Sequence, residues 1–390
     1  MSTPGSDLRL CVYSDYPYQQ LPEGISASRS FALFVNQLGT HVGGIVVMGR
    51  LDPSASAMRH RVAKHSRFVP LPYYQSLSRP SALLGKLTAS LRRCWRTLED
   101  CDCIWVLGPN PLAIAFAVIA ALRRKQVVLG VRQNWPVYVR RRHPRRPGLW
   151  IAAILMEATF RGLALISPVV AVGPDLARRY RHARSLLEIA VSLVDDADIV
   201  PPRTAMQRSY DRELRLLCVG RLDDEKNPLF LAHVLGRLRE IDPRWRLIVC
   251  GDGPMEDQLE IRLCSLGLAE CSELRGYVPF GPELMAIYRS SHAFLHTAWT
   301  EGLPQVLLES FAAGLPTIAT DVGGVGDALN GRVRLIPPND VEAAAREASA
   351  IAADAELRAT LIRAGHEYVR SRTAGHEAAR VAAFLTDAVR

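Results

Sequence analysis

Short runs of β-branched and other apolar residues alternate with longer, helix-length segments along almost the whole chain. Alternation of this kind is typical of parallel sheets whose strands are joined by helices. It predicts an α/β protein made of doubly wound sheets. The predicted strands are Leu8–Tyr13, Gly44–Met48, Ile104–Leu107, Val127–Val131, Val169–Val172, Leu214–Val219, Arg246–Cys250, Ala293–His296, Thr317–Ala319 and Val333–Ile336.

The length of the chain indicates two domains. A chain of 390 residues is long for a single core and fits two domains of ordinary size. Residues 196–213 are acidic, then proline-bearing and polar, and are predicted to be a linker. The domains would then cover residues 1–195 and 214–373. Two doubly wound sheets of this kind bind ligands in a crevice at the carboxyl ends of their strands.

Positive charge is concentrated in the first half. Residues 1–200 contain 26 Lys and Arg against 13 Asp and Glu, whereas residues 201–390 contain 22 against 26. A basic first half favours anionic partners such as a phospholipid membrane, a phosphorylated acceptor or nucleic acid. The densest basic run is Arg140–Arg146, which is either a solvated loop or a contact for an anionic membrane or a lipid phosphate. Nucleic acid is disfavoured because interleaved exposed aromatic residues are missing.

The hydrophobic segments are predicted to be core. Residues 104–122 are uncharged and long enough to suggest a membrane span, but Gly108–Pro111 interrupts them. We interpret the segment as a buried strand, a loop and a core helix. The chain starts with a strand-like run rather than a signal peptide, and its eight scattered cysteines suit reduced thiols. A cytoplasmic location is therefore expected, with peripheral contact at the inner face of a membrane as a further expectation.

The segment Trp299–Pro316 carries the most specific chemistry. Glu301 and Glu309 lie eight positions apart, and Gln305–Ala313 is a good helix former that follows Pro304. In a continuous helix the two carboxylates would be roughly 12 Å apart along the axis, whereas catalytic carboxyl pairs are about 5 to 9 Å apart. The spacing suits an elongated ligand that is contacted at two places.

The positive charges upstream suit a diphosphate. Arg221 and Lys226 follow a predicted strand, and together a planar guanidinium and a flexible ammonium can neutralise a diphosphate from two sides. The alternative is a solvated loop in which they pair with Asp223, Asp224 and Glu225. Free N–H groups near Gly302 and Leu303 offer a further seat for an anion.

The Glu-x7-Glu segment resembles the donor-site signature of the retaining glycosyltransferases of family 4, which have the GT-B fold. Further pieces of the family pattern follow in order, and the resemblance is close over residues 214–330. These pieces are Val219-Gly-Arg-Leu222 with Lys226, Val249–Pro254, Leu274–Val278 and Ala319–Gly324. The resemblance implies a GT-B-like pair of Rossmann-like domains that face a central crevice, with residues 374–390 forming a helix that packs back on the first domain.

The resemblance also implies roles for individual residues. Glu301 would contact hydroxyls of the donor sugar and Glu309 those of the ribose. Arg221 and Lys226 would hold the diphosphate and stabilise the charge that develops as it departs, so no metal or other cofactor is expected. Backbone groups complete the donor site: those of Gly253, Val278, Gly302 and Leu303.

The first domain departs from the family pattern. The loop where many members carry a glycine pair has only Gly24, which could still approach the phosphate, and the position of a common histidine is taken by Arg132-Gln133-Asn134. Arg132 or Gln133 could still hydrogen-bond the sugar. Asp100-Cys-Asp102 has the form of a metal motif but precedes its strand, at the wrong end for a ligand site, and is interpreted as a loop. His296 is interpreted as a satisfied core histidine, with contact to the crevice as the alternative.

The predicted function is transfer of a hexose from a UDP- or GDP-linked sugar to a glycan, a lipid-linked or a small-molecule acceptor. The reaction would retain the anomeric configuration and need no metal. Two alternatives stay open. One is a sugar-nucleotide epimerase of the same fold, and the other is a degenerate protein that binds a sugar nucleotide without catalysis.

Overall fold

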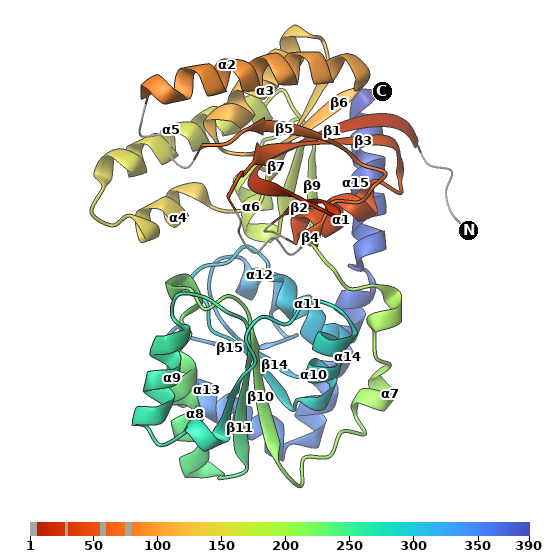
Figure 1. Ribbon diagram of the computed structural model, residues 1–390. Coiled ribbons are helices and arrows are strands. Elements are labelled where there is room, and N and C mark those ends of the chain that lie inside the picture. Colours follow the sequence, from red (N-terminus) through yellow and green to blue (C-terminus); the bar gives the residue numbers. More distant parts are fainter. Residues whose placement is uncertain (1–5, 28–29, 55–59, 75–79) are drawn as a thin grey trace. The chain divides into compact units, whose positions relative to one another are not determined.

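The chain forms two compact units (Figure 1). A computed structural model describes residues 6–27, 30–54, 60–74 and 80–390. Unit 1 consists of Met1–Val191 together with Ala374–Arg390, and unit 2 of Ser192–Thr373. The predicted linker 196–213 differs from this division, because it lies within unit 2 and contains η2 (Asp196–Asp198) and α7 (Pro202–Ala205).

Unit 1 contains a largely parallel sheet. Its strands are β1 (Ser6–Leu21), β2 (Gly24–Ala27), β3 (Val42–Leu51), β4 (His60–Arg61), β5 (Arg67–Pro72), β6 (Cys103–Gly108), β7 (Gln126–Val131), β8 (Val169–Val172) and β9 (Leu186–Ile189). The order is β4-β2-β1-β6-β7-β8-β9, and β3 pairs with both β1 and β5. Among the strands that the structure describes in this unit, β2 is antiparallel to both of its neighbours, β1 and β4.

Helices surround this sheet. They are α1 (Phe31–Leu38), α2 (Pro80–Thr97), α3 (Pro111–Leu122), α4 (Trp135–Arg142), α5 (Pro147–Ala164), α6 (Pro174–Arg179) and α15 (Ala374–Val389), with η1 (Leu98–Asp100) before β6. The uncharged run 104–122 is a buried strand and a helix, as predicted. Asn110 caps α3 by accepting a hydrogen bond of 2.8 Å from the N–H of Ala113. Among the helices of the described residues, none has the length and hydropathy that crossing a bilayer requires.

The helix α15 belongs to unit 1 although it follows unit 2 in the sequence. It packs against α1 and against β1, β7 and β9. Val381 and Leu385 are fully buried, and so is Glu377, whose carboxylate lies 2.9 Å from the Arg380 guanidinium. Arg380 also donates a hydrogen bond of 3.0 Å to the carbonyl oxygen of Glu188. These contacts make the end of the chain part of the core of unit 1.

Unit 2 is built on a six-stranded parallel sheet with the order β12-β11-β10-β13-β14-β15. The strands are β10 (Leu214–Val219), β11 (Trp245–Cys250), β12 (Ser272–Leu274), β13 (Ala293–His296), β14 (Thr317–Thr320) and β15 (Arg334–Ile336). The helices are α8 (Leu229–Ile241), α9 (Glu256–Ser265), α10 (Pro282–Ser290), α11 (Gln305–Ala312), α12 (Val325–Leu329), α13 (Val341–Ala353) and α14 (Ala355–Arg370), with η3 (Asp224–Lys226) and η4 (Ala269–Cys271). Central strands buried on both faces account for the continuous apolar runs in the sequence.

The order of the strands determines where a site can form. β10 pairs with β11 on one side and with β13 on the other. The chain therefore moves outward from β10 to β12 and then returns to place β13 beside β10. A reversal of this kind opens a crevice at the carboxyl ends of the two central strands. The loops that follow β10 and β13 are those that carry Arg221, Lys226 and Glu301.

Candidate functional site

Lys226 and Glu301 meet at the carboxyl ends of β10 and β13. The ammonium of Lys226 forms a direct ion pair with Glu301 Oε1, although the residues are 75 positions apart. Backbone contacts fasten the two loops: the Thr297 hydroxyl donates to the carbonyl of Lys226 at 2.7 Å, and the N–H of Trp299 donates to the carbonyl of Glu225 at 2.9 Å. Both charged side chains are less than a third exposed. The pair is thus held in a fixed, partly desolvated position.

Arg221 is oriented by its own loop. Its guanidinium pairs with Asp223 and, at 2.5 Å, with Glu225 Oε1, while 42% of its side chain remains exposed. These are the local ion pairs of the solvated-loop alternative. A diphosphate would therefore have to compete with two carboxylates for Arg221, whereas Lys226 faces the loop of Glu301.

The backbone between Glu301 and α11 offers hydrogen-bond donors. The helix begins at Gln305, and Pro304 is its N-cap rather than its first residue. In the part of the chain that the structure describes, the N–H groups of Gly302 and Leu303 donate no hydrogen bond to other protein groups. Unsatisfied N–H groups beside a helix start attract anions. They lie next in sequence to the carboxylate that Lys226 holds.

Two glycines permit the close packing behind this site. A Cβ atom at Gly253 would lie 2.7 Å from the carbonyl oxygen of Leu222, in the loop of Arg221. Gly323 has φ +56°, and a Cβ atom there would overlap the carbonyl oxygen of Glu301. The sequence pattern included Gly323 without assigning it a role. The structure places it directly against the backbone of Glu301.

Glu309 is buried in α11 rather than exposed on its surface. Its side chain accepts a hydrogen bond of 2.9 Å from the hydroxyl of Tyr288 in α10, and the residue is only 4% exposed. Burial raises the pKa of Glu309 to about 7, although the hydrogen bond from Tyr288 lowers it. The structure therefore provides the partner that an acid in an apolar segment requires.

This burial predicts a pH-dependent stability. The pKa of Glu309 in the folded chain is above its ordinary value, so its contribution is complete at pH 4 and is lost as the pH rises through about 7. We expect Glu309→Gln to remove up to roughly 3 kcal/mol of the fall in unfolding free energy between pH 5 and pH 8. Urea unfolding at both pH values measures the difference. The exposed carboxyl of Glu260 provides the control, Glu260→Gln, and an unchanged pH dependence in Glu309→Gln would contradict the prediction.

His296 lies beside the ion pair. Its Nε2 is 3.5 Å from Glu301 Oε1, and the ring is buried. Burial, and secondly the charge of Lys226, lower the pKa of His296 to about 3, so the imidazole is neutral at pH 7. Neither ring nitrogen has a hydrogen-bond partner among the described residues. The expectation of a satisfied core histidine is therefore wrong: His296 is buried but unsatisfied.

The remaining predicted donor residues are partly enclosed. Val278 and Leu303 are buried, whereas Gly253 and Gly302 are partly accessible. Val278 lies four positions after the end of β12, the edge strand that pairs with β11. Apart from Glu309 in α11, the residues of the predicted donor site thus come from the segments that follow β10, β11, β12 and β13.

The predicted contacts in unit 1 have their own surroundings. Arg132 follows β7, donates a hydrogen bond of 2.8 Å to the Tyr16 hydroxyl, and lies 4.3 Å from the centre of the Phe31 ring. Gln133 is exposed. Gly24 opens β2 and pairs in register with Leu21 of β1. These contacts orient Arg132 within unit 1.

The Asp-x-Asp segment has a structural role. Asp102 pairs with Arg9 at 2.7 Å and accepts a hydrogen bond from the N–H of the same residue, and Asp100 pairs with Arg67 at 2.9 Å. Over the described ranges, no group of three His, Cys, Asp or Glu residues is arranged to hold a metal ion. The two aspartates tie β1 and β5 to the start of β6, consistent with the loop interpretation.

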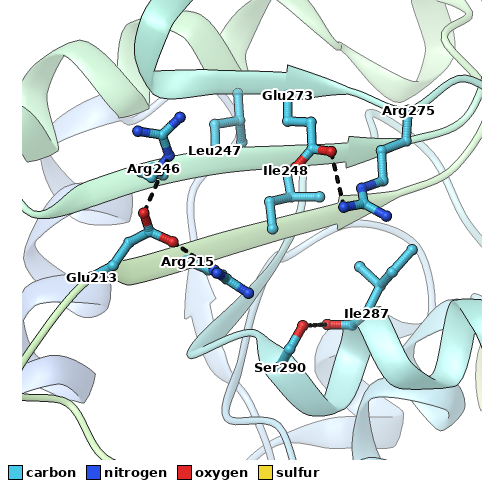
Figure 2. A pocket seen from close by; sticks show the side chains of 9 residues that line it. All are labelled: Glu213, Arg215, Arg246, Leu247, Ile248, Glu273, Arg275, Ile287 and Ser290. Atoms are coloured by element: carbon cyan, nitrogen blue, oxygen red, sulfur yellow. Dashed lines mark hydrogen bonds and ion pairs between the residues drawn. The ribbon is translucent and has the colours of Figure 1, made fainter.

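A separate pocket of about 240 Å³ lies against β10, β11 and β12 (Figure 2). Its charged residues are already paired: Glu213 lies 2.7 Å from Arg215 and 3.5 Å from Arg246, and Glu273 lies 2.9 Å from Arg275. None of the predicted donor residues lines it. It is therefore distinct from the site at the carboxyl ends of β10 and β13.

Several known proteins have similar sequences. Residues 204–368 match the model of the family described as "Glycosyl transferases group 1". The sulfoquinovosyl transferase SQD2 of Arabidopsis thaliana is 26% identical over 77% of this chain, which spans 59% of its length. A GDP-mannose-dependent α-(1-6)-phosphatidylinositol monomannoside mannosyltransferase of Mycolicibacterium smegmatis is 26% identical over 81% of each chain. A D-inositol 3-phosphate glycosyltransferase of Salinispora tropica is 28% identical, and the chain spans 45% of it.

Solved structures show the same fold. Sucrose-phosphate synthase of Thermosynechococcus elongatus superposes with a TM-score of 0.71 at 17% identity, over 97% of this chain and 98% of that one. HepE of Anabaena in complex with UDP gives 0.70 at 14% identity, over 97% and 100%. The predicted α/β fold, with GT-B-like Rossmann domains, is confirmed. The family model matches residues 204–368, and the relatives named above are glycosyltransferases.

Proposed function

We propose that this chain is a retaining glycosyltransferase that moves a hexose from a nucleoside-diphosphate sugar to an acceptor without a metal. The observation that carries the proposal is the Lys226–Glu301 pair, which lies beside the N–H groups of Gly302 and Leu303. A cation, a carboxylate and free backbone donors at one point suit the junction of a sugar with a diphosphate.

Each group then has a role in transfer. Glu301 would accept hydrogen bonds from hydroxyls of the donor sugar. Lys226, assisted by Arg221 and the two N–H groups, would stabilise the negative charge that grows on the diphosphate as the bond from the anomeric carbon to the phosphate oxygen breaks. The acceptor oxygen attacks the same face of the sugar, and its proton passes to the departing phosphate oxygen. The arginine and lysine supply the positive charge that this step requires.

The proposal also concerns the nucleotide of the donor and the chemical class of the acceptor. A GDP-mannose-dependent relative and a neighbour solved with UDP support the two candidates, GDP and UDP. The names of that relative and of the inositol phosphate enzyme each include a phosphorylated compound. We therefore favour an acceptor that carries a phosphate or is linked to lipid, bound by the basic unit 1. The proposed location of the protein is the cytoplasm.

Nucleotide binding tests the donor site directly. We expect UDP or GDP, but not both equally, to raise the melting temperature by several degrees, since a ligand at 100 times its Kd stabilises a protein by about 2.7 kcal/mol. EDTA should leave the shift unchanged. ADP and dTDP serve as matched controls in the same thermal-shift measurement. No shift from any diphosphate at millimolar concentration would exclude the proposed site.

Product analysis separates the alternatives. Release of the diphosphate that depends on an acceptor supports transfer. Conversion of the sugar nucleotide without an acceptor would indicate the epimerase, and binding without turnover or slow hydrolysis would indicate the degenerate binder.

A further inference from the structure

One face of α5 exposes large aliphatic side chains. Ile151, Ile154 and Leu155 are 60%, 57% and 62% exposed. These three residues are called the apolar face of α5. In Figure 1, α4 and α5 (yellow) form a pair of helices that projects from the sheet of unit 1. Isolated exposed aliphatic residues are common, but a contiguous group of this kind marks an interaction surface.

The spacing of the buried residues explains this face. α5 packs inward through Ala153, Phe160 and Ala164, together with Glu157. Ile151 and Leu155 are separated by four positions, and Ile151 and Ile154 by three, so they are neighbours on the opposite side of the helix. The helix is therefore apolar on both sides over its first half, although only one side meets the rest of unit 1.

Arginines border the apolar face. Arg140 and Arg142 lie at the end of α4, and Arg145 and Arg146 immediately precede α5; all four are exposed. These four residues are called the basic cluster. The sequence contains no Asp or Glu between Asp102 and Glu157, and Glu157 is buried on the inward side of α5.

Internal contacts hold the helical pair together. The indole N–H of Trp150 donates a hydrogen bond of 2.8 Å to the carbonyl of His143, and the Arg140 guanidinium lies 5.6 Å from the Trp150 ring centre. Trp135 stacks on Tyr138 with ring centres 5.5 Å apart. The apolar face and the basic cluster thus belong to one pair of helices that contact each other.

We propose that the apolar face of α5 and the basic cluster dock this protein on an anionic lipid bilayer. A helix with exposed aliphatic residues and flanking arginines lies in the plane of the interface, with its apolar side among the acyl chains and its cations among the phosphates. Charge distinguishes this occupant from a second copy of the chain. Two copies packed through the same face would bring like-charged arginine clusters together.

Vesicle flotation with the full chain tests the apolar part. The wild-type protein should float with phosphatidylcholine vesicles that contain 30% phosphatidylglycerol, and binding should weaken as salt is added. The double variant Ile154→Glu/Leu155→Glu should bind at least tenfold more weakly. The control Ile241→Glu/Ile261→Glu makes the same change at two exposed isoleucines of unit 2, which are 48% and 68% exposed, and should bind as the wild type does.

A second double variant and its control test the contribution of the basic cluster. Arg145→Glu/Arg146→Glu should lose at least tenfold in binding to the same vesicles, since each arginine near an anionic surface contributes about fivefold. Arg203→Glu/Arg212→Glu changes the net charge equally at exposed sites of unit 2 and should lose much less. Melting curves of all variants verify that they are folded.

The proposal is overturned if the wild type does not bind the anionic vesicles, or if each variant binds them as well as its control variant does. Light scattering identifies the rival occupant: a dimer that Ile154→Glu/Leu155→Glu converts to a monomer, without vesicle binding by the wild type, assigns the face to a second copy. Nucleotide binding does not enter the assay, so its outcome is independent of the donor site.

Discussion

Lys226→Ala is expected to lower kcat/KM for sugar transfer by a factor of about 10² to 10³, the usual effect of removing one group that stabilises a developing oxyanion. The loss has two causes. The departing diphosphate loses its cation, and Glu301 loses the partner that holds it between the loops of β10 and β13. Initial rates with the nucleotide sugar that the thermal-shift panel identifies measure the effect.

Two further variants make this result specific. Lys226→Arg keeps the charge and should recover part of the activity, whereas Lys86→Ala, an exposed lysine of α2, should leave it unchanged. Because an unpaired, partly buried Glu301 also destabilises the fold, melting curves should accompany the kinetics. Near-normal transfer by a folded Lys226→Ala protein would remove Lys226 from the site.

Gly323→Ala should give the second large effect, through the backbone. A methyl group there overlaps the carbonyl oxygen of Glu301, and the positive φ adds strain. We expect unfolding free energy to fall by about 1 to 3 kcal/mol and turnover to fall at least tenfold, since the Glu301 loop must move. Urea unfolding and initial rates measure both.

Gly331 provides the matched control for this substitution. It also has a positive φ, of +77°, but a Cβ atom there meets nothing within 4 Å. Gly331→Ala should therefore show the backbone strain without the loss of turnover. If both variants lose the same activity, the contact between Gly323 and Glu301 does not control the site.

The fold was predictable because buried parallel strands leave a plain signal. All ten predicted strands occur, and the predicted helix Gln305–Ala313 corresponds to α11 within one residue. The strands that were not predicted, β2, β4, β5, β9 and β12, are short or contain polar residues and proline, as in Arg67–Pro72 of β5. Apolar periodicity cannot identify such strands, because neighbouring elements rather than their own composition place them.

The site was predictable only in part, because its contacts join distant loops. Spacing alone selected Glu301 and Lys226, but their ion pair depends on the return of the chain that places β13 beside β10. Apolar neighbours indicated that Glu309 needs a partner, yet Tyr288 is 21 positions away and carries no local signal. The unsatisfied ring of His296 likewise depends on which groups surround it in three dimensions.

Arg221 illustrates the opposite case. Its partners Asp223 and Glu225 lie within four residues, and the sequence already offered those local ion pairs as an alternative. The structure shows them in place. A diphosphate that binds Arg221 has to displace both carboxylates from its guanidinium. The thermal shifts of Arg221→Ala with the same nucleotides, compared with those of the wild type, test this exchange.

The position of α15 has a consequence for biosynthesis. Its residues leave the ribosome after those of unit 2, yet they fill the core of unit 1, whose strands are made before unit 2. Unit 2 can therefore complete its sheet on the ribosome while unit 1 still lacks a helix. Until α15 arrives, the surfaces of α1 and β7 that it covers stay open to chaperones, which makes nascent unit 1 the slower part of the chain to mature.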